Sequence, residues 1–402
     1  MNVYDRLKVP RRINASGTLT RLGGSLMAPE VLDAMREAAK SYVDIADLQA
    51  AASGVIAHHT GAEAGIVTSG ASAALTLATA ACLTGMDAAS MDRLPDTDGM
   101  ACEVVMCRHH RTGYDHAIRA AGARIHEVGF NDRTMGAGIR GVEQWEIEAV
   151  IGANTVAVAY SASTVEDPPL TEVIEVAHAH GLPVIVDAAA QLPPKTNLTY
   201  FIEQGADLVA FSGGKAIAGP QGTGILAGKR DLIAAAALQQ LDMDVPAKNW
   251  TPPNSLIPQQ TLKGLPHHGL GRGFKVSKED IVGLIVALER FTSEDHDVLN
   301  EVRESLLRKL ANRLTNISGL KIKLFSASET GRVPILELHI DKFITGIDAV
   351  SVSATLQADR QPINLGECKA NQNVLLIDPM GLQDGDSEII AKRLLSLLGK
   401  EV

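Results

Sequence analysis

The chain has few cysteines, no block of basic residues and no long apolar run, and each absence argues against a class of protein. Its four cysteines show neither the paired spacing of a zinc site nor the density of a disulfide framework. The net charge is −10, and no lysine- and arginine-rich patch suited to nucleic acid occurs. No apolar stretch reaches the roughly 18 residues of a membrane span, and the N-terminus lacks the apolar core of a signal peptide. We therefore expect a soluble cytoplasmic protein that acts on a small molecule, without metal, membrane or nucleic acid.

Short apolar strands alternate with helices through much of the sequence. Seven strands are expected, at residues 65–68, 103–106, 124–128, 156–160, 184–187, 208–211 and 224–228. Their β-branched, nearly uninterrupted apolar character and the helices between them predict an α/β fold with a large, mainly parallel seven-stranded sheet covered on both faces. Because single cores stop growing near roughly 250–300 residues, a chain of 402 residues is expected to form two domains.

The pattern divides the chain into three regions. Residues 1–28 are expected to form an N-terminal arm, residues 29–265 the large domain, and residues 266–402 a smaller α/β domain. Strands expected near 320–325, 333–340 and 373–377 indicate an antiparallel type of sheet in the last region. Residues 242–273, rich in proline, glycine, histidine and glutamine, predict a long ordered loop of the kind that often carries function.

Three motifs follow expected strands, at the sheet edge where open α/β proteins bind ligands. The first, residues 68–72, joins a strand to a helix. Its small residues let backbone N–H groups at a helix N-terminus approach an anion, and Ser69 and Ser72 add hydroxyl donors. Taken alone, such a turn is more often explained by close packing.

The second motif places Asp187 at the end of an apolar strand. A carboxylate in this low-dielectric setting ionises only if a cation or a strong donor faces it. A pyridinium nitrogen is one such partner, and the resulting ion pair makes the ring an electron sink. A helix N-cap is the alternative interpretation of Asp187.

The third motif places Lys215 in the glycine-rich, nearly uncharged stretch 210–224. A buried or electrostatically crowded lysine loses its proton more easily and becomes a nucleophile, and the glycines allow close approach of a ligand. An exposed loop lysine is the alternative. Lys215 follows Asp187 by 28 residues, which is one strand–helix–strand step, so both are expected at neighbouring strand ends.

With these motifs the sequence resembles the fold-type-I pyridoxal-phosphate enzymes, whose fold is that of aspartate aminotransferase. More narrowly, it resembles the selenocysteine synthase-like branch that includes the D-glucosaminate-6-phosphate ammonia-lyase family. The resemblance covers most of residues 13–290 and is carried by residues 13–24, 60–64, 68–74, 186–194, 205–215, 219–221 and 271–276. Its most specific part is the Ser-Gly-Gly-Lys element that ends at Lys215, together with Gly219-Pro-Gln. The cofactor that it implies is pyridoxal 5'-phosphate.

The resemblance also implies a role for individual residues. Lys215 would carry the cofactor as a Schiff base and shuttle protons, and Asp187 would pair with the ring nitrogen. The residues expected at the phosphate are Ser69, Gly70, Ala71, Ser72 and Ser212. Those expected at the ring are Gln191, near its hydroxyl, and either His109 or His110, stacked on its face. Substrate-binding candidates are Arg21, Arg272, Arg360, His267 and His268, with Lys275 and Arg332 as further cations suited to a carboxylate or another anion.

The expected reaction is α-proton abstraction from a small amino acid or amino sugar acid, with α,β-elimination of the ammonia-lyase type favoured. Racemisation or epimerisation is the alternative, because it shares the first carbanion. Selenium transfer to seryl-tRNA is disfavoured, since the tRNA enzymes of this branch carry an extra N-terminal domain. A non-catalytic binding protein is disfavoured by the intact Lys215 and Asp187, and a dehydrogenase by the missing Gly-x-Gly-x-x-Gly turn. Because enzymes of this superfamily usually complete the site across a dimer interface, a homodimer or larger homo-oligomer is expected.

Overall fold

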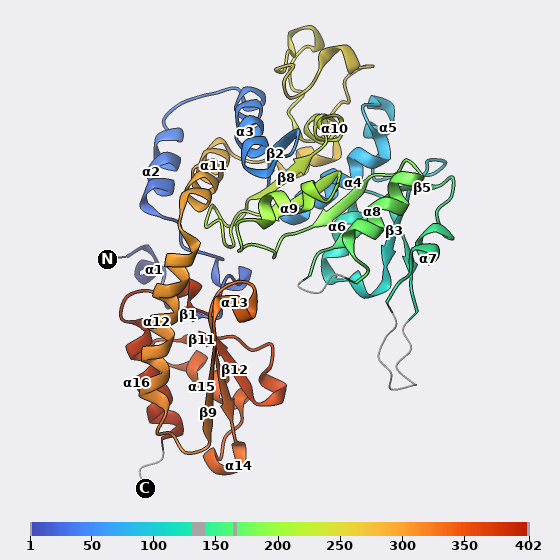
Figure 1. The fold of residues 1–402 in the computed structure, drawn as a ribbon. Coiled ribbons are helices and arrows are strands. Elements are labelled where there is room, and N and C mark those ends of the chain that lie inside the picture. Colours follow the sequence, from blue (N-terminus) through green and yellow to red (C-terminus); the bar gives the residue numbers. More distant parts are fainter. Residues whose placement is uncertain (1, 131–140, 164–166, 400–402) are drawn as a thin grey trace. The chain divides into compact units, whose positions relative to one another are not determined.

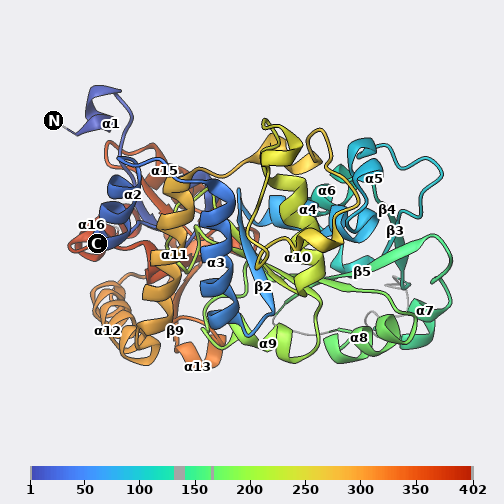
Figure 2. The same ribbon diagram turned by 90° about the horizontal axis from the view of Figure 1, so that it is seen from above.

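The computed structural model describes residues 2–130, 141–163 and 167–399 and divides into two compact units (Figure 1). The larger unit is Met27–Ser293, and the smaller unit joins Met1–Leu26 to Glu294–Val402. Both boundaries differ from the expected ones. The N-terminal residues belong to the smaller unit because β1 (Ile13–Ala15) pairs in parallel with β11 (Ile363–Leu365). Residues 266–293 belong to the larger unit because α11 (Lys278–Ser293) packs against α2 (Pro29–Ala38) and α3 (Ile45–Thr60) (Figure 2).

The larger unit contains a seven-stranded sheet with the order β2-β8-β7-β6-β5-β3-β4. Its strands are β2 (Ala64–Thr68), β3 (Glu103–Cys107), β4 (Arg124–Val128), β5 (Thr155–Ser161), β6 (Val184–Asp187), β7 (Leu208–Ser212) and β8 (Gly224–Gly228). The run from β7 to β4 is parallel, whereas β8 lies antiparallel to both β2 and β7. The prediction of a mainly parallel seven-stranded sheet is confirmed.

Alternate side chains of each strand enter two separate apolar layers. In β6, Val184 and Val186 enter one layer and Ile185 enters the other, as the two-residue period of a strand requires. The first layer is covered by α3, α8 (Leu170–Ala179), α9 (Asn197–Glu203) and α11, and the second by α4 (Ala71–Thr84), α6 (His116–Ala120) and α10 (Arg230–Gln240). Helix α4 is apolar on nearly all sides because it lies between the sheet and α10.

The smaller unit contains an antiparallel sheet with the order β12-β10-β9, which confirms the expected type of pairing. Its strands are β9 (Leu320–Phe325), β10 (Ile335–Ile340) and β12 (Val374–Ile377), and its longer helices are α12 (His296–Leu314), α15 (Ala349–Ala358) and α16 (Asp386–Leu398). The remaining α-helices of the described chain are short: α1 (Val3–Arg6), α5 (Ala88–Arg93), α7 (Gln144–Glu148), α13 (Ala327–Thr330) and α14 (Lys342–Thr345). Across the described part of the chain, no helix combines the length and the apolar character that a membrane crossing needs.

Candidate active site

The turns after β2, β6 and β7 leave the sheet at the same edge. Thr68 at the end of β2 and Ser212 at the end of β7 both pair with Gly224, one from each side of β8. Asp187 at the end of β6 pairs with Ala210, two residues before Ser212. The register therefore brings the Ser69 turn, Asp187 and the Lys215 turn to one region of the larger unit.

The N-terminus of α4 presents backbone donors to this region. Gly70 is the N-cap of α4 with φ of 99°, a conformation that favours glycine, and no side chain caps the helix. The first N–H groups of a helix lack acceptors inside it and carry partial positive charge, which makes them an anion site. A Cβ added to Gly224 would lie 2.6 Å from the Ala71 nitrogen, so only glycine on β8 permits this close approach.

The two serines of the turn differ in their surroundings. The half-buried Ser69 donates its hydroxyl to the Phe274 carbonyl at 2.9 Å, which ties the turn to η6 (Leu270–Phe274). Ser69 would have to leave this bond to donate to an anion. Ser72 is exposed in the first turn of α4. Backbone N–H groups, rather than hydroxyls, are thus the donors that the structure presents most directly.

Asp187 is a half-buried carboxylate at the end of its strand. Its Oδ1 accepts a hydrogen bond from the Ala189 N–H at 3.0 Å. Burial raises the pKa of Asp187, while the Ala189 hydrogen bond and the positive charge of Lys215 offset part of this effect. A carboxylate whose ionised form is disfavoured by burial is suited to a cationic partner such as a pyridinium N–H.

Lys215 lies half-buried in a turn built on glycines. Gly213 donates its N–H to the Thr223 carbonyl and accepts from Gly219 N–H, both at 2.9 Å. A Cβ added to Gly214 would lie 2.4 Å from the Gln221 Cα, so the two arms of the turn touch backbone to backbone.

Gln191 and Ser212 lie beside these groups. Gln191 donates its side-chain N–H to the Ala162 carbonyl at 2.7 Å, and its backbone carbonyl accepts from the Asn197 side-chain amide at 2.7 Å. The first of these bonds bridges the segments after β5 and β6. Ser212 is half-buried at the end of β7. Contacts of Gln191 with a ring hydroxyl and of Ser212 with a phosphate remain predictions.

The two adjacent histidines turn toward the segment after β5. His110 is buried, and its Nε2 lies 3.0 Å from the Asp167 carbonyl, which His109 also contacts. His110 meets the Tyr160 ring edge-on, with 4.5 Å between centroids, and burial lowers the pKa of His110 to about 4. Among the described residues, the small pocket beside Asp187 is lined by Thr112 and Tyr114 and not by either histidine. Tyr114 and Tyr160 are the aromatic residues among those that line this pocket, and Tyr114 is the exposed one.

The candidates from the long loop form ion pairs on the surface of the larger unit. Arg272 donates to Asp242 through Nε at 2.8 Å and forms an ion pair with the same oxygen through Nη2 at 2.6 Å. His268 contacts Asp244 at 3.2 Å, and the fully exposed His267 contacts Asp92. Lys275 is exposed. The structure thus gives Arg272, His267 and His268 carboxylate partners of their own and does not gather them around Asp187.

The smaller unit holds the remaining candidates. Arg21 pairs with Glu367 at 3.0 Å, and Arg360 is exposed. Arg332 is half-buried; burial lowers its pKa, and the charge of Asp378 opposes this effect. Arg303, which sequence reasoning missed, shares this environment and donates to the Asn300 side chain at 3.2 Å. The negative charges of Asp378 and Glu294 raise the pKa of Arg303 and so oppose the effect of burial.

The chain is similar to known proteins along nearly its whole length. The family model described as "Aminotransferase class-V" matches residues 103–244. A D-glucosaminate-6-phosphate ammonia lyase of Salmonella typhimurium is 32% identical, with 98% of this chain and 97% of the relative covered. A solved structure of D-glucosaminate-6-phosphate ammonia-lyase has a TM-score of 0.81 at 31% identity, covering 99% of this chain and 98% of that one.

More distant relatives carry other activities in their names. A Streptomyces 5'-C-glycyluridine monooxygenase-decarboxylase is 28% identical, over 98% of this chain and 92% of that protein. An L-seryl-tRNA(Sec) selenium transferase of Geotalea uraniireducens is 26% identical, over 97% of this chain and 84% of that protein. The resemblance to the selenocysteine synthase-like branch is confirmed.

Fold and site together define a pyridoxal 5'-phosphate-dependent enzyme of fold type I, of the lyase kind. Within that class, the chain belongs to the D-glucosaminate-6-phosphate ammonia lyase family.

Proposed function

We propose that this protein is an ammonia-lyase that removes the α-proton of a small amino acid or amino sugar acid and eliminates a β-substituent. The observation that carries the proposal is the convergence of three groups at one sheet edge: the open N-terminus of α4, the carboxylate of Asp187 and the amine of Lys215. Full-length similarity to an ammonia lyase supports elimination over racemisation.

The residues present fit pyridoxal 5'-phosphate. The uncapped α4 N-terminus, where Gly70 and Gly224 leave no Cβ in the way, would hold the phosphate with Ser69, Ala71 and Ser212. Asp187 would accept a hydrogen bond from the ring nitrogen, and Lys215 Nζ would bond the aldehyde carbon. When bound, the cofactor withdraws electrons from the substrate α-carbon and so acidifies its C–H bond.

Lys215 is the residue we assign to proton transfer. With the cofactor bound, the uncharged Lys215 amine would accept the α-proton of the substrate. A β-hydroxyl would then depart as water after taking up one proton, which Nζ would return. Hydrolysis of the resulting enamine consumes one water and releases ammonia and a keto acid, so the overall reaction balances.

The substrate class is proposed from the comparison with relatives. The name of the ammonia lyase relative specifies a substrate with a carboxylate and a phosphate. We therefore propose an amino sugar acid, phosphorylated or not, as the first substrate class to examine.

Trapping and turnover test the proposal in sequence. The purified protein with added pyridoxal 5'-phosphate is reduced with borohydride, and mass spectrometry of its peptides should find the pyridoxyl group on Lys215. The unreduced protein is then incubated with D-glucosaminate 6-phosphate, D-glucosaminate, and D- and L-serine, and ammonia, keto acid and chirality are measured. Ammonia and keto acid in equal amounts support the lyase. A change of chirality without ammonia would identify a racemase, and label on another lysine would overturn the site.

The cellular location, the assembly and the partners of the enzyme are also proposed. We expect a cytoplasmic homodimer or larger homo-oligomer that acts on a small molecule without nucleic acid. The net charge of −10 supports the last point, since it disfavours contact with phosphate backbones. Light scattering after gel filtration tests the assembly, and a monomeric, fully active enzyme would contradict it.

A further inference from the structure

A short turn between β3 and α6 forms one wall of the pocket beside Asp187. Thr112, Tyr114 and Asp115 line this pocket together with Tyr160 and Ser161. The turn is closed by the Asp115 N–H, which donates to the Thr112 carbonyl at 3.2 Å, and by the Tyr114 N–H, which donates to the Thr112 hydroxyl at 3.1 Å. Tyr114 lines this pocket but leaves 69% of its surface exposed.

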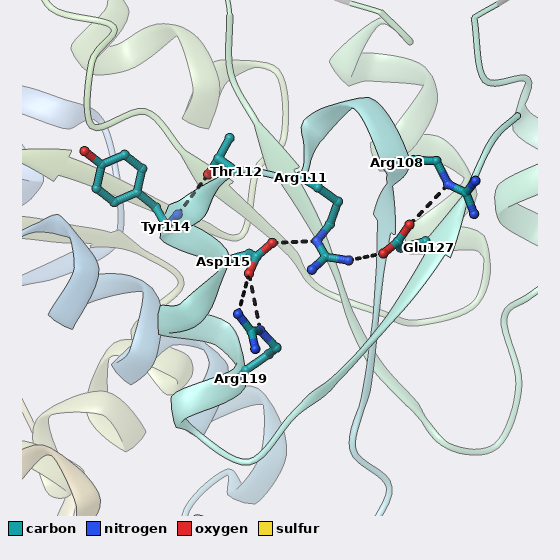
Figure 3. Close-up of polar contacts among 7 residues, drawn as sticks. All are labelled: Arg108, Arg111, Thr112, Tyr114, Asp115, Arg119 and Glu127. Carbon is teal, nitrogen blue, oxygen red and sulfur yellow. Dashed lines mark hydrogen bonds and ion pairs between the residues drawn. The ribbon is translucent and has the colours of Figure 1, made fainter. Parts of the chain in front are cut away.

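Asp115 anchors this turn through two arginines (Figure 3). It is 6% exposed. Its Oδ2 accepts from Arg111 Nε at 2.5 Å, and its Oδ1 accepts from Arg119 Nη2 at 3.1 Å and Nε at 3.3 Å. Burial alone would raise the pKa of Asp115, but the hydrogen bonds and charges of Arg111 and Arg119 outweigh burial and lower it. The carboxylate is therefore held ionised and saturated with donors.

The anchor extends to the sheet. Arg111 also contacts Glu127 on β4, and Glu127 forms an ion pair with Arg108, whose Nε lies 3.2 Å from Oε2 (Figure 3). Arg108, Glu127, Arg111, Asp115 and Arg119 thus form one chain of alternating charges, here called the charge ladder. Isolated surface ion pairs contribute little, but a network around a buried carboxylate fixes geometry, because removing one member leaves a desolvated charge unpaired.

We propose that Tyr114 lies against the face of the cofactor ring held by Asp187, and that Asp115 is a positioning residue that acts through Tyr114 by way of the charge ladder. The inference rests on the proposed function. An exposed phenol at a pocket gains apolar burial and offset stacking when a flat ring covers it. The two histidines expected at this position turn instead toward Asp167. A turn of two or three residues also needs an anchor to hold the Tyr114 side chain in one position. Asp115, the next residue, supplies that anchor.

A double-mutant cycle on cofactor binding tests the inference. The affinity for pyridoxal 5'-phosphate and the induced circular dichroism of its visible band are measured for wild type, Tyr114→Ala, Asp115→Asn and the double variant. Tyr114→Ala should weaken binding roughly three- to tenfold and alter the induced signal, and Tyr114→Phe should restore both. Asp115→Asn should reproduce the altered signal and much of the lost affinity. In the Tyr114→Ala background Asp115→Asn should add little, because coupled residues are non-additive.

The controls separate the possible failures. Arg124→Gln, at an exposed arginine of β4 outside the charge ladder, should leave both readings unchanged. If Asp115→Asn folds poorly, Arg119→Gln is the substitute, because it removes one of the two arginines that donate to the same carboxylate. It should shift the induced circular dichroism in the same direction. Fully additive effects of Tyr114→Ala and Asp115→Asn, or wild-type readings in both, would overturn the inference. Absence of cofactor binding by the wild type would instead overturn the proposed function.

Discussion

Gly224 on β8 and Gly70 at the start of α4 touch backbone to backbone. A Cβ added to Gly224 would fall 2.5 Å from the Gly70 carbonyl carbon and 2.8 Å from its oxygen. Gly70 in turn has a φ of 99°, which disfavours any side chain. The geometry of the proposed phosphate site is therefore set by two glycines on different elements, and neither contributes a side chain to it.

Gly224→Ala should displace the N-terminus of α4. We expect cofactor affinity to fall at least about tenfold and the free energy of unfolding to fall by about 1–3 kcal/mol, since the methyl group overpacks a closed contact. Cofactor titration and urea unfolding measure the two effects. Gly222→Ala is the matched control, because a Cβ at Gly222 meets nothing within 4 Å. Equal behaviour of the two variants would show that the contact does not define the site.

Lys215→Ala should abolish turnover while leaving the fold intact. Loss of a positioned acid–base group lowers the rate by about 10²–10⁴-fold, and loss of covalent attachment should lower it further. The variant should bind the cofactor reversibly, and borohydride should no longer fix it to the protein. Lys40→Ala, at an exposed lysine of the same unit, should retain wild-type activity. Full activity in Lys215→Ala is incompatible with the mechanism.

Asp187→Asn should raise the thermal stability of the apoprotein and lower the turnover of the enzyme. Because burial raises the folded-state pKa of Asp187, its ionisation destabilises the apoprotein as pH rises from the ordinary value of 3.8 through the raised pKa. At neutral pH apo Asp187→Asn should therefore unfold at a higher temperature than apo wild type, with a smaller difference near pH 4. Turnover should fall by about 10²–10³-fold, as for other lost electrostatic stabilisers. Asp98→Asn, at an exposed aspartate, is the control for a general charge effect; lower stability of apo Asp187→Asn would contradict the argument.

Sequence patterns predicted the strands well because each strand is a short apolar run between helices. The Lys215 and Asp187 motifs were also readable, since a lone charge in an apolar or glycine-rich stretch stands out. Helix ends were less readable. Residues 278–314 predict one continuous helical run, but the structure ends α11 at Ser293 and begins α12 at His296. Asp295 caps α12 through the N–H groups of Asp297 and Val298, and this break coincides with the boundary between the two units.

Tyr114 shows what sequence patterns could not supply. His109 and His110 follow a strand, where the resemblance implies a residue stacked on the cofactor ring, so either of them was expected there. Their orientation depends on Asp167, which lies 57 residues beyond His110 in the chain. A contact of such separation leaves no local periodicity. Only the tertiary structure shows that the Tyr114 phenol is exposed at the pocket and that the His110 imidazole is buried.

His110 should make stability depend on mildly acidic pH. Its folded-state pKa is lowered from 6.5 to about 4, chiefly by burial, and its Nδ1 has no hydrogen-bond partner among the described residues. Between these values the unfolded state binds more protons, so stability should fall as pH decreases, by at most about 1.4 kcal/mol per pH unit. His110→Gln should reduce this slope between pH 6.5 and 4 in urea unfolding. His116→Gln, at an exposed histidine, should keep it. An unchanged slope in His110→Gln would place the titrating group elsewhere.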